Sequence, residues 1–129
     1  MAKKVAVQER NPFPAISVRQ PYAELILLGF KTMEFRTWNS HYRGPMLLHA
    51  PRTITEGDRS ITFDLGMAPA RFETLPRGAY IGVVYLADVL EFEHENVFEV
   101  YPVVEFEAPI PGKGKTNLFY PSDNEWDAI

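Results

Sequence analysis

The sequence predicts an α+β fold that is mainly β, a small β-barrel or rolled sheet of roughly five to six strands with one to three short helices. Segments with alternating or β-branched residues follow one another directly along most of the chain. No βαβ repetition is present, which argues against a doubly wound parallel sheet. The chain has 129 residues, which suits one domain with a core of its own.

The first half of the chain predicts three strands and one helix. Residues 15–19 alternate and carry β-branched side chains, as a short strand does. Pro21 suits the first turn of a helix, and Gly29 is well placed to end it. Residues 32–37 alternate between apolar and polar or charged side chains, which predicts a strand with one polar face. Residues 46–50 form a continuous apolar run and predict a buried strand.

The middle of the chain mixes breakers with the strongest strand pattern. Residues 51–78 are interrupted by prolines, although Thr55-Glu56-Gly57-Asp58 can open a helix there. Residues 79–90 give the longest strand pattern. Residues 100–106 predict another strand, in which Pro102 indicates an edge or a bulge.

The ends of the chain differ from its centre. Residues 109–115 predict an irregular loop, and residues 118–120 predict a last short strand. We therefore expect a loose N-terminal arm over residues 1–13, one domain over residues 14–120 and a polar C-terminal tail over residues 121–129.

Several classes of protein are excluded or disfavoured by composition. The sequence has no cysteine, which excludes disulfides, thiolate metal sites and cysteine nucleophiles. No apolar run is long enough for a membrane span, and no signal-peptide core follows the N-terminus, so we expect a cytoplasmic protein. His41, His49 and His94 do not have the spacing of metal ligands, and we expect neither a metal nor a cofactor. His49 lies in an apolar run and fits a hydrogen-bonded core histidine better than a ligand.

Charge is distributed unevenly along the chain. The net charge is −4, which argues against a generally basic nucleic-acid binder. Yet residues 1–77 have an excess of Lys and Arg, whereas residues 78–129 carry most of the acidic side chains. The acidic residues fit solvated strand faces. Alternatively, one acidic face lies opposite a basic cleft that attracts a phosphate-bearing ligand.

Three short segments carry the candidate binding residues. Arg19-Gln20 lies where a strand turns into a helix, so Arg19 fits either an anion site or a structural pair with a carboxylate. Lys31, Glu34 and Arg36 fit either surface ion pairs or the floor of a charged cleft, because Glu34 and Arg36 share one face of a strand. Other candidates are the aromatic residues beside these cations and the cations of a glycine-containing loop: Trp38, Tyr42, Lys113 and Lys115.

These segments together resemble a known family. Residues 16–23 and 29–38 are similar to the activating-signal-cointegrator homology (ASCH) domain, whose signature is G-x-K-x-x-E-x-R. Gly29, Lys31, Glu34 and Arg36 match each fixed position of that signature. Blocks over residues 42–50, 75–82 and 111–115 also match the family, so the resemblance covers almost the whole chain.

The resemblance implies a PUA-like fold, a compact β-barrel with helices, and binding of RNA or a related nucleotide in a cleft lined by Lys31, Glu34 and Arg36, with Arg19 nearby. Some small relatives are amidohydrolases that remove the acetyl group of N4-acetylcytidine with a Lys, a Thr and a Glu. The Lys corresponds to Lys31, but the Thr position is occupied here by Glu34.

Two functions therefore remain open at the level of sequence. The first is a binding module for RNA or a modified nucleotide, in which the cations hold phosphates and Glu34 reads a base edge. The second is an amidohydrolase acting on a small nucleoside amide, with Lys31 and Glu34 as catalytic residues. A carboxylate beside Lys31 favours the charged ammonium, which weighs against a lysine base.

Overall fold

The computed structural model describes residues 13–129, so the predicted arm falls almost entirely outside the described residues. Five strands form one sheet in the order β1-β3-β4-β5-β2. The strands are β1 (Ala15–Ser17), β2 (Met33–Arg36), β3 (Gly44–Ala50), β4 (Ala79–Glu91) and β5 (Asn96–Pro111). The helices are α2 (Tyr22–Leu27), α3 (Glu56–Asp64), α4 (Pro69–Thr74) and α5 (Asp123–Ala128). The mainly β character is as predicted, with one helix more than the predicted range.

The sheet is open, so the prediction of a closed barrel is wrong. β1 pairs in parallel with β3, every other pairing is antiparallel, and β1 and β2 form the two edges. The edge strands span three and four residues, and they are not paired with each other. Instead, the Arg36 guanidinium donates a hydrogen bond of 2.7 Å to the backbone oxygen of Ser17, so one side chain bridges the two edges.

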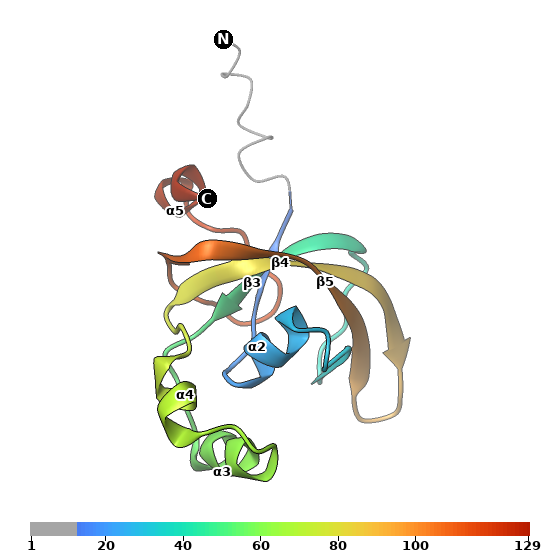
Figure 1. Ribbon diagram of the computed structural model, residues 1–129. Helices are drawn as coiled ribbons and strands as arrows, with labels where there is room; N and C mark the ends of the chain where they lie inside the picture. The colour runs from blue at the N-terminus through green and yellow to red at the C-terminus, as the bar shows by residue number, and fades with distance from the viewer. Residues whose placement is uncertain (1–12) are drawn as a thin grey trace.

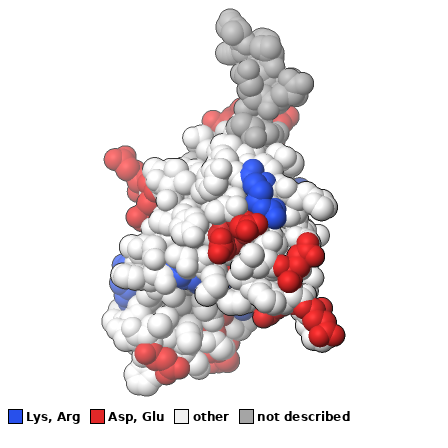
Figure 2. All heavy atoms as spheres, turned by 90° about the vertical axis from the view of Figure 1, so that its right-hand side faces the viewer, with Lys and Arg blue, Asp and Glu red and all other residues white. Residues whose placement is uncertain are grey.

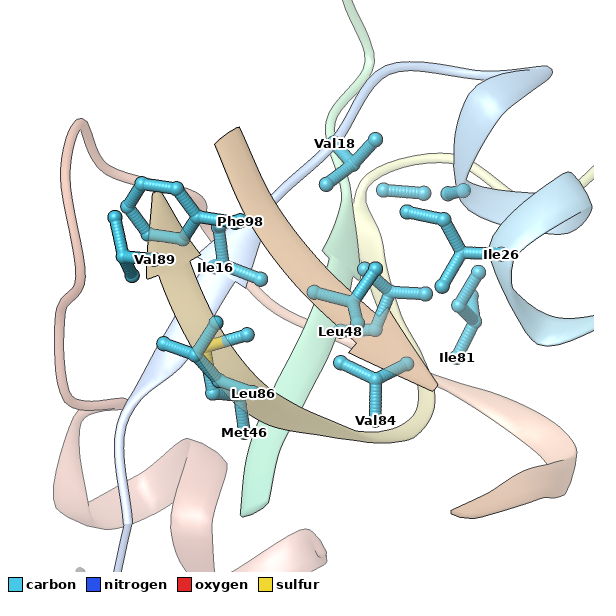
Figure 3. Close-up of a cluster of buried hydrophobic side chains, with 13 residues drawn as sticks. Ile16, Val18, Ile26, Met46, Leu48, Ile81, Val84, Leu86, Val89 and Phe98 are labelled. Carbon is cyan, nitrogen blue, oxygen red and sulfur yellow. The ribbon is translucent and has the colours of Figure 1, made fainter. Parts of the chain in front are cut away.

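β4 and β5 arch over α2, which lies on the concave side of the sheet (Figure 1). As predicted, α2 follows Pro21 and is ended by Gly29, whose φ of +82° lies in the left-handed region that glycine adopts without strain. Apolar side chains from β1, α2, β3, β4 and β5 point toward one another beneath the arch (Figure 3). The central members are fully buried: Ile16, Ile26, Leu48, Leu86 and Phe98.

The helices outside the sheet differ from the prediction in part. α3 begins as expected, because Thr55 and Asp58 form a capping box at its N-terminus. α4 was not expected, since Pro69 was interpreted only as a breaker. Proline is tolerated in the first helical turn, and Pro69 stands there. The predicted polar tail contains α5, whose Trp126 packs edge-on against Phe13 at 5.8 Å.

β5 is longer than predicted and contains the expected irregularity. Its register against β4 shifts between Val83 and Val84, where Val104 and Pro102 are the respective partners, so one residue of β5 is extra. The predicted loop over residues 109–115 begins only after Pro111. Residues 118–120 form a single bridge from Phe119 to Ala15 rather than a strand.

We predict that Gly82→Ala destabilises the sheet by roughly 1–3 kcal/mol, the usual cost of overpacking a core. A methyl group at Gly82 would lie 2.4 Å from the backbone oxygen of Val104 and 2.9 Å from Leu27 Cδ2. Chemical denaturation measures the loss. Gly57→Ala is the control, because its methyl group meets only Thr55 Oγ1 at an ordinary 3.6 Å. Equal stabilities of the two variants would contradict the prediction.

The acidic second half forms no single patch on the side of the molecule where the β4–β5 turn lies. Asp and Glu side chains appear there as separate clusters among uncharged residues (Figure 2). The six glutamates from Glu91 to Glu107 are exposed, apart from half-buried Glu99, as expected of solvated strand faces. Among the described residues, none of the helices has the length and apolarity needed to cross a membrane.

Candidate functional site

A cavity of about 590 Å³ lies between the two edge strands of the sheet. We call it the first cavity. Its walls come from segments that are distant in sequence: the end of β1, α2, β2, the turn after β3 and the loop after β5. Its charged lining residues are four cations and one carboxylate: Arg19, Lys31, Arg36, Lys115 and Glu34. The predicted candidates Arg19, Lys31, Glu34 and Arg36 are therefore brought together in one place.

Glu34 is the central group of this cluster. Its Oε2 accepts a hydrogen bond of 2.7 Å from Arg36 Nε, and its Oε1 lies 3.2 Å from Lys31 Nζ. The Glu34 side chain is only 12% exposed, so the two cations offset much of the cost of burying the carboxylate. The polar face of β2 is thus turned into the cavity, whereas Met33 on its other face is half exposed.

Lys31 is positioned by contacts on three sides. Its ammonium donates to the backbone oxygen of Met33 and forms the ion pair with Glu34. It also lies 5.9 Å from the ring centre of Tyr22 and 5.5 Å from that of Phe35. Both aromatic rings line the first cavity. A flat, uncharged ligand can therefore meet aromatic surface beside a cation.

Arg19 lines the cavity and is also a structural residue. Its guanidinium forms two hydrogen bonds with Asp58, of 2.8 Å from Nε and 3.3 Å from Nη2. Although burial acts to raise the pKa of Asp58, the hydrogen bonds from Arg19 and Thr55 outweigh it and lower this pKa. Of the two alternatives for Arg19, the structure shows the carboxylate pair, which holds α3 against the start of α2.

Three other candidates lie outside the first cavity. Gln20 is fully buried: its Oε1 accepts from the backbone N–H of Glu24, and its Nε2 donates to the backbone oxygen of Pro76. Trp38 packs edge-on against Phe98 at 5.0 Å, although its ring also meets Arg36. Tyr42 donates its hydroxyl to the backbone oxygen of Pro45. The polar groups of Gln20 and the hydroxyl of Tyr42 are thus used within the fold.

A second cavity, of about 410 Å³, adjoins the first and shares Ser17, Pro51, Lys115 and Thr116 with it. Lys113 and Lys115, the predicted cations of the loop after β5, both line it. Three lining residues are not among the predicted candidates: Arg52 lines the second cavity, and Phe35 and Thr53 line the first. A signal for Phe35 was present in the sequence, because Phe35 alternates with charged residues in a predicted strand. The turn that carries Arg52 and Thr53 has no periodic pattern from which these residues could be predicted.

His49 is a hydrogen-bonded core residue, as predicted. Its Nε2 lies 2.8 Å from the backbone oxygen of Gly112, which can only accept, so Nε2 carries the hydrogen. Nδ1 then accepts from the Ser17 hydroxyl at 2.9 Å. Burial lowers the pKa of the imidazole, against the opposing effect of the hydrogen bond to Gly112. No metal-binding group of three or more His, Cys, Asp or Glu exists among residues 13–129.

Because His49 is buried in its neutral form, we expect the stability of the folded protein to change between pH 7 and pH 5. Because its pKa is lower in the folded state, the unfolded chain binds the proton first as the pH falls below about 6.5. The stability is therefore full above that pH and decreases below it. The free energy of unfolding, measured against urea at several pH values, should fall more steeply for the wild type than for His49→Gln. Parallel pH profiles would contradict this prediction.

Comparison with known proteins identifies the family of this chain. No curated protein matches the chain. The family model of the ASCH domain matches residues 16–128. This range includes all lining residues of both cavities and every strand of the sheet, apart from the first residue of β1. Because this match covers nearly the whole described chain, the protein belongs to the ASCH-domain family.

Proposed function

We propose that this protein is an RNA-binding module that holds a single-stranded nucleotide in the first cavity. The observation that carries the proposal is the grouping of Lys31, Glu34 and Arg36 in a cavity that is also lined by Tyr22 and Phe35. Unpaired bases are recognised by stacking on aromatic rings together with hydrogen bonds to base edges. Both kinds of contact are offered here within one cavity.

Glu34 retains the capacity to read a base edge. Each carboxylate oxygen can accept about two hydrogen bonds, and Oε1 and Oε2 each have one cationic partner. The exocyclic amino group of a base is a suitable donor for the remaining lone pairs. Arg36 uses Nε and Nη2 within the fold. Its other N–H groups are available to a ligand, because a guanidinium has five donors.

The test is a titration of a labelled single-stranded RNA and of the corresponding duplex at two salt concentrations. The single strand should bind more tightly than the duplex. Its affinity should fall as the salt concentration rises, because the cations of the protein displace counterions from a few phosphates of the RNA. Lys31→Ala should weaken binding by about tenfold, the usual effect of losing one charged contact. Arg59→Ala is the matched control, since Arg59 pairs with Glu73 outside both cavities. A preference for the duplex, or no effect of Lys31→Ala, would reject the proposal.

An amidohydrolase is the second candidate. It is supported by the hydroxyl residues Ser17, Thr53 and Thr116, which line the same cavity as Lys31 and Glu34. Because Lys31 Nζ lies 3.2 Å from Glu34 Oε1 and this pair favours the charged ammonium, Glu34 rather than Lys31 would be the base in such an enzyme, and Lys31 would stabilise the oxyanion. Incubation with N4-acetylcytidine separates the two candidates, because hydrolysis releases cytidine and acetate. Release that is lost in both Lys31→Ala and Glu34→Ala would favour the enzyme. The absence of release by a protein that binds RNA would favour the binding module.

A further inference from the structure

Three cations in the described part of the chain have no partner. The other lysines and arginines of residues 13–129 all form ion pairs with carboxylates, in which the acidic partners are Asp58, Glu34, Asp88, Glu73 and Glu24. The side chains of Arg52, Lys113 and Lys115 form no ion pair or hydrogen bond with any described residue. All three line the second cavity.

The second cavity has an anion-binding character because no carboxylate lines it. The Glu125 carboxylate lies beside the loop that lines this cavity, where it accepts from the Tyr80 hydroxyl and from the backbone N–H of Lys113. Burial acts to raise the pKa of Glu125, but these hydrogen bonds outweigh it and lower the pKa. Three like charges around one hollow repel one another, and a bound anion removes this repulsion.

Two glycines let the backbone pack closely around the second cavity. A methyl group at Gly114 would lie 2.3 Å from Ser17 Oγ and 2.7 Å from His49 Nδ1, so the loop packs directly on the hydrogen-bonded Ser17–His49 pair. This contact fixes the backbone between Lys113 and Lys115. A methyl group at Gly78 would lie 3.0 Å from Arg52 Nε, so the guanidinium rests against the Gly78 backbone.

We propose that the second cavity is a phosphate-binding subsite formed by Arg52, Lys113 and Lys115. Because the two cavities share four lining residues, Lys115 among them, a nucleotide can place its base in the first and a phosphate in the second. The ligand is then a phosphorylated nucleotide or an RNA phosphodiester, and a free nucleoside binds poorly. The assignment of the base rests on the proposed function, whereas the phosphate site itself does not.

The test uses inorganic phosphate, cytidine, cytidine 3′- and 5′-monophosphates and the dinucleotide CpC. Binding is followed through the backbone amide signals of Gly112 and Gly114 in NMR spectra. A monophosphate should bind at least about tenfold more tightly than cytidine, as charge-assisted hydrogen bonds predict. A further gain for CpC over both monophosphates would identify a phosphodiester as the preferred ligand, and no gain would identify a mononucleotide phosphate.

Variants test whether the cations of the second cavity cause the tighter binding of the monophosphates. Arg52→Gln combined with Lys113→Gln should reduce the advantage of the monophosphates to about twofold or less, since each lost charge weakens the phosphate contact. The control is a protein with the same change in net charge, Arg43→Gln combined with Arg59→Gln, whose native partners Asp88 and Glu73 lie outside both cavities. This control should retain the full advantage of the monophosphates.

The outcomes separate the subsite from the proposed function. If inorganic phosphate shifts the Gly112 and Gly114 signals only when Arg52 and Lys113 are present, the subsite is supported even if no nucleotide binds. If RNA binding depends on Lys31 and Arg36 but the double variant binds it like the wild type, the subsite is overturned and the proposed function stands. Equal affinities of the wild type for cytidine and its monophosphates, together with no effect of inorganic phosphate on the Gly112 and Gly114 signals, would also overturn the subsite.

Discussion

Arg36→Met is expected to weaken the binding of single-stranded RNA by about tenfold to a hundredfold, corresponding to the loss of one or two charged contacts. Arg36 has two roles in the first cavity. It holds Glu34 through a 2.7 Å hydrogen bond from Nε, and it bridges β2 to β1 through a 2.7 Å hydrogen bond from Nη2 to the Ser17 oxygen. The variant keeps the approximate length of the side chain but removes the charge and every donor.

The conservative variant Arg36→Lys distinguishes charge from geometry. A lysine restores the positive charge, but it cannot make the two divergent hydrogen bonds of a guanidinium. We expect Arg36→Lys to regain the salt dependence of binding and only part of the affinity. Fluorescence titrations at two salt concentrations measure both quantities. Wild-type affinity in Arg36→Met would show that the contact between the edge strands does not shape the RNA site.

The stability of the Arg36 variants provides a check on folding. Losing the hydrogen bond to the Ser17 oxygen should cost about 1 kcal/mol, the usual net value for one such bond, and losing one of the two cations that pair with the largely buried Glu34 should add a cost of similar size in Arg36→Met. A cost of that size leaves the sheet intact, because β1 remains paired with β3 and β2 remains paired with β5. A change in RNA affinity can then be attributed to the cavity rather than to unfolding.

The part of the site whose geometry the alternation pattern could predict lies on one strand. The alternation of residues 32–37 placed Glu34 and Arg36 on the same face, and their 2.7 Å contact agrees with that placement. Arg52, Thr53 and Thr116 could not be predicted in the same way. They lie in turns and loops and reach the cavities only because the sheet brings the end of β3 next to the loop after β5.

The errors in the fold have equally specific causes. Barrel closure depends on whether the two edge strands are brought together and pair, and strand number alone does not settle this. Gln20, which is predicted as a ligand-binding residue, is fully buried, and its amide forms hydrogen bonds with the backbone of Glu24 and Pro76. α5 had a signal that could have been used, the capping box formed by Ser122 and Glu125.

Asp58→Ala is expected to destabilise the protein by roughly 3 kcal/mol, the sum of a lost helix cap and lost charged hydrogen bonds. The Asp58 side chain is only 1% exposed and accepts hydrogen bonds from the Arg19 guanidinium and from the backbone N–H of Thr55. It therefore connects the start of α3 to a residue that lines the first cavity. Asp64→Ala, at the exposed end of the same helix, is the matched control and should change stability little.

Asp58→Asn separates the cap from the ion pair, because the amide oxygen can still accept from Thr55 while the negative charge is absent. The pKa of Asp58 is lowered in the folded state from 3.8, so the charged carboxylate adds stability that is present above that pH and is lost as the pH falls through the lower folded value. The advantage of the wild type over Asp58→Asn should therefore be constant from pH 7 to about pH 5 and shrink below about pH 4. Urea denaturation at each pH measures it. If Asp58→Asn were as stable as the wild type at every pH, the cap alone, and not the pair with Arg19, would make Asp58 stabilising.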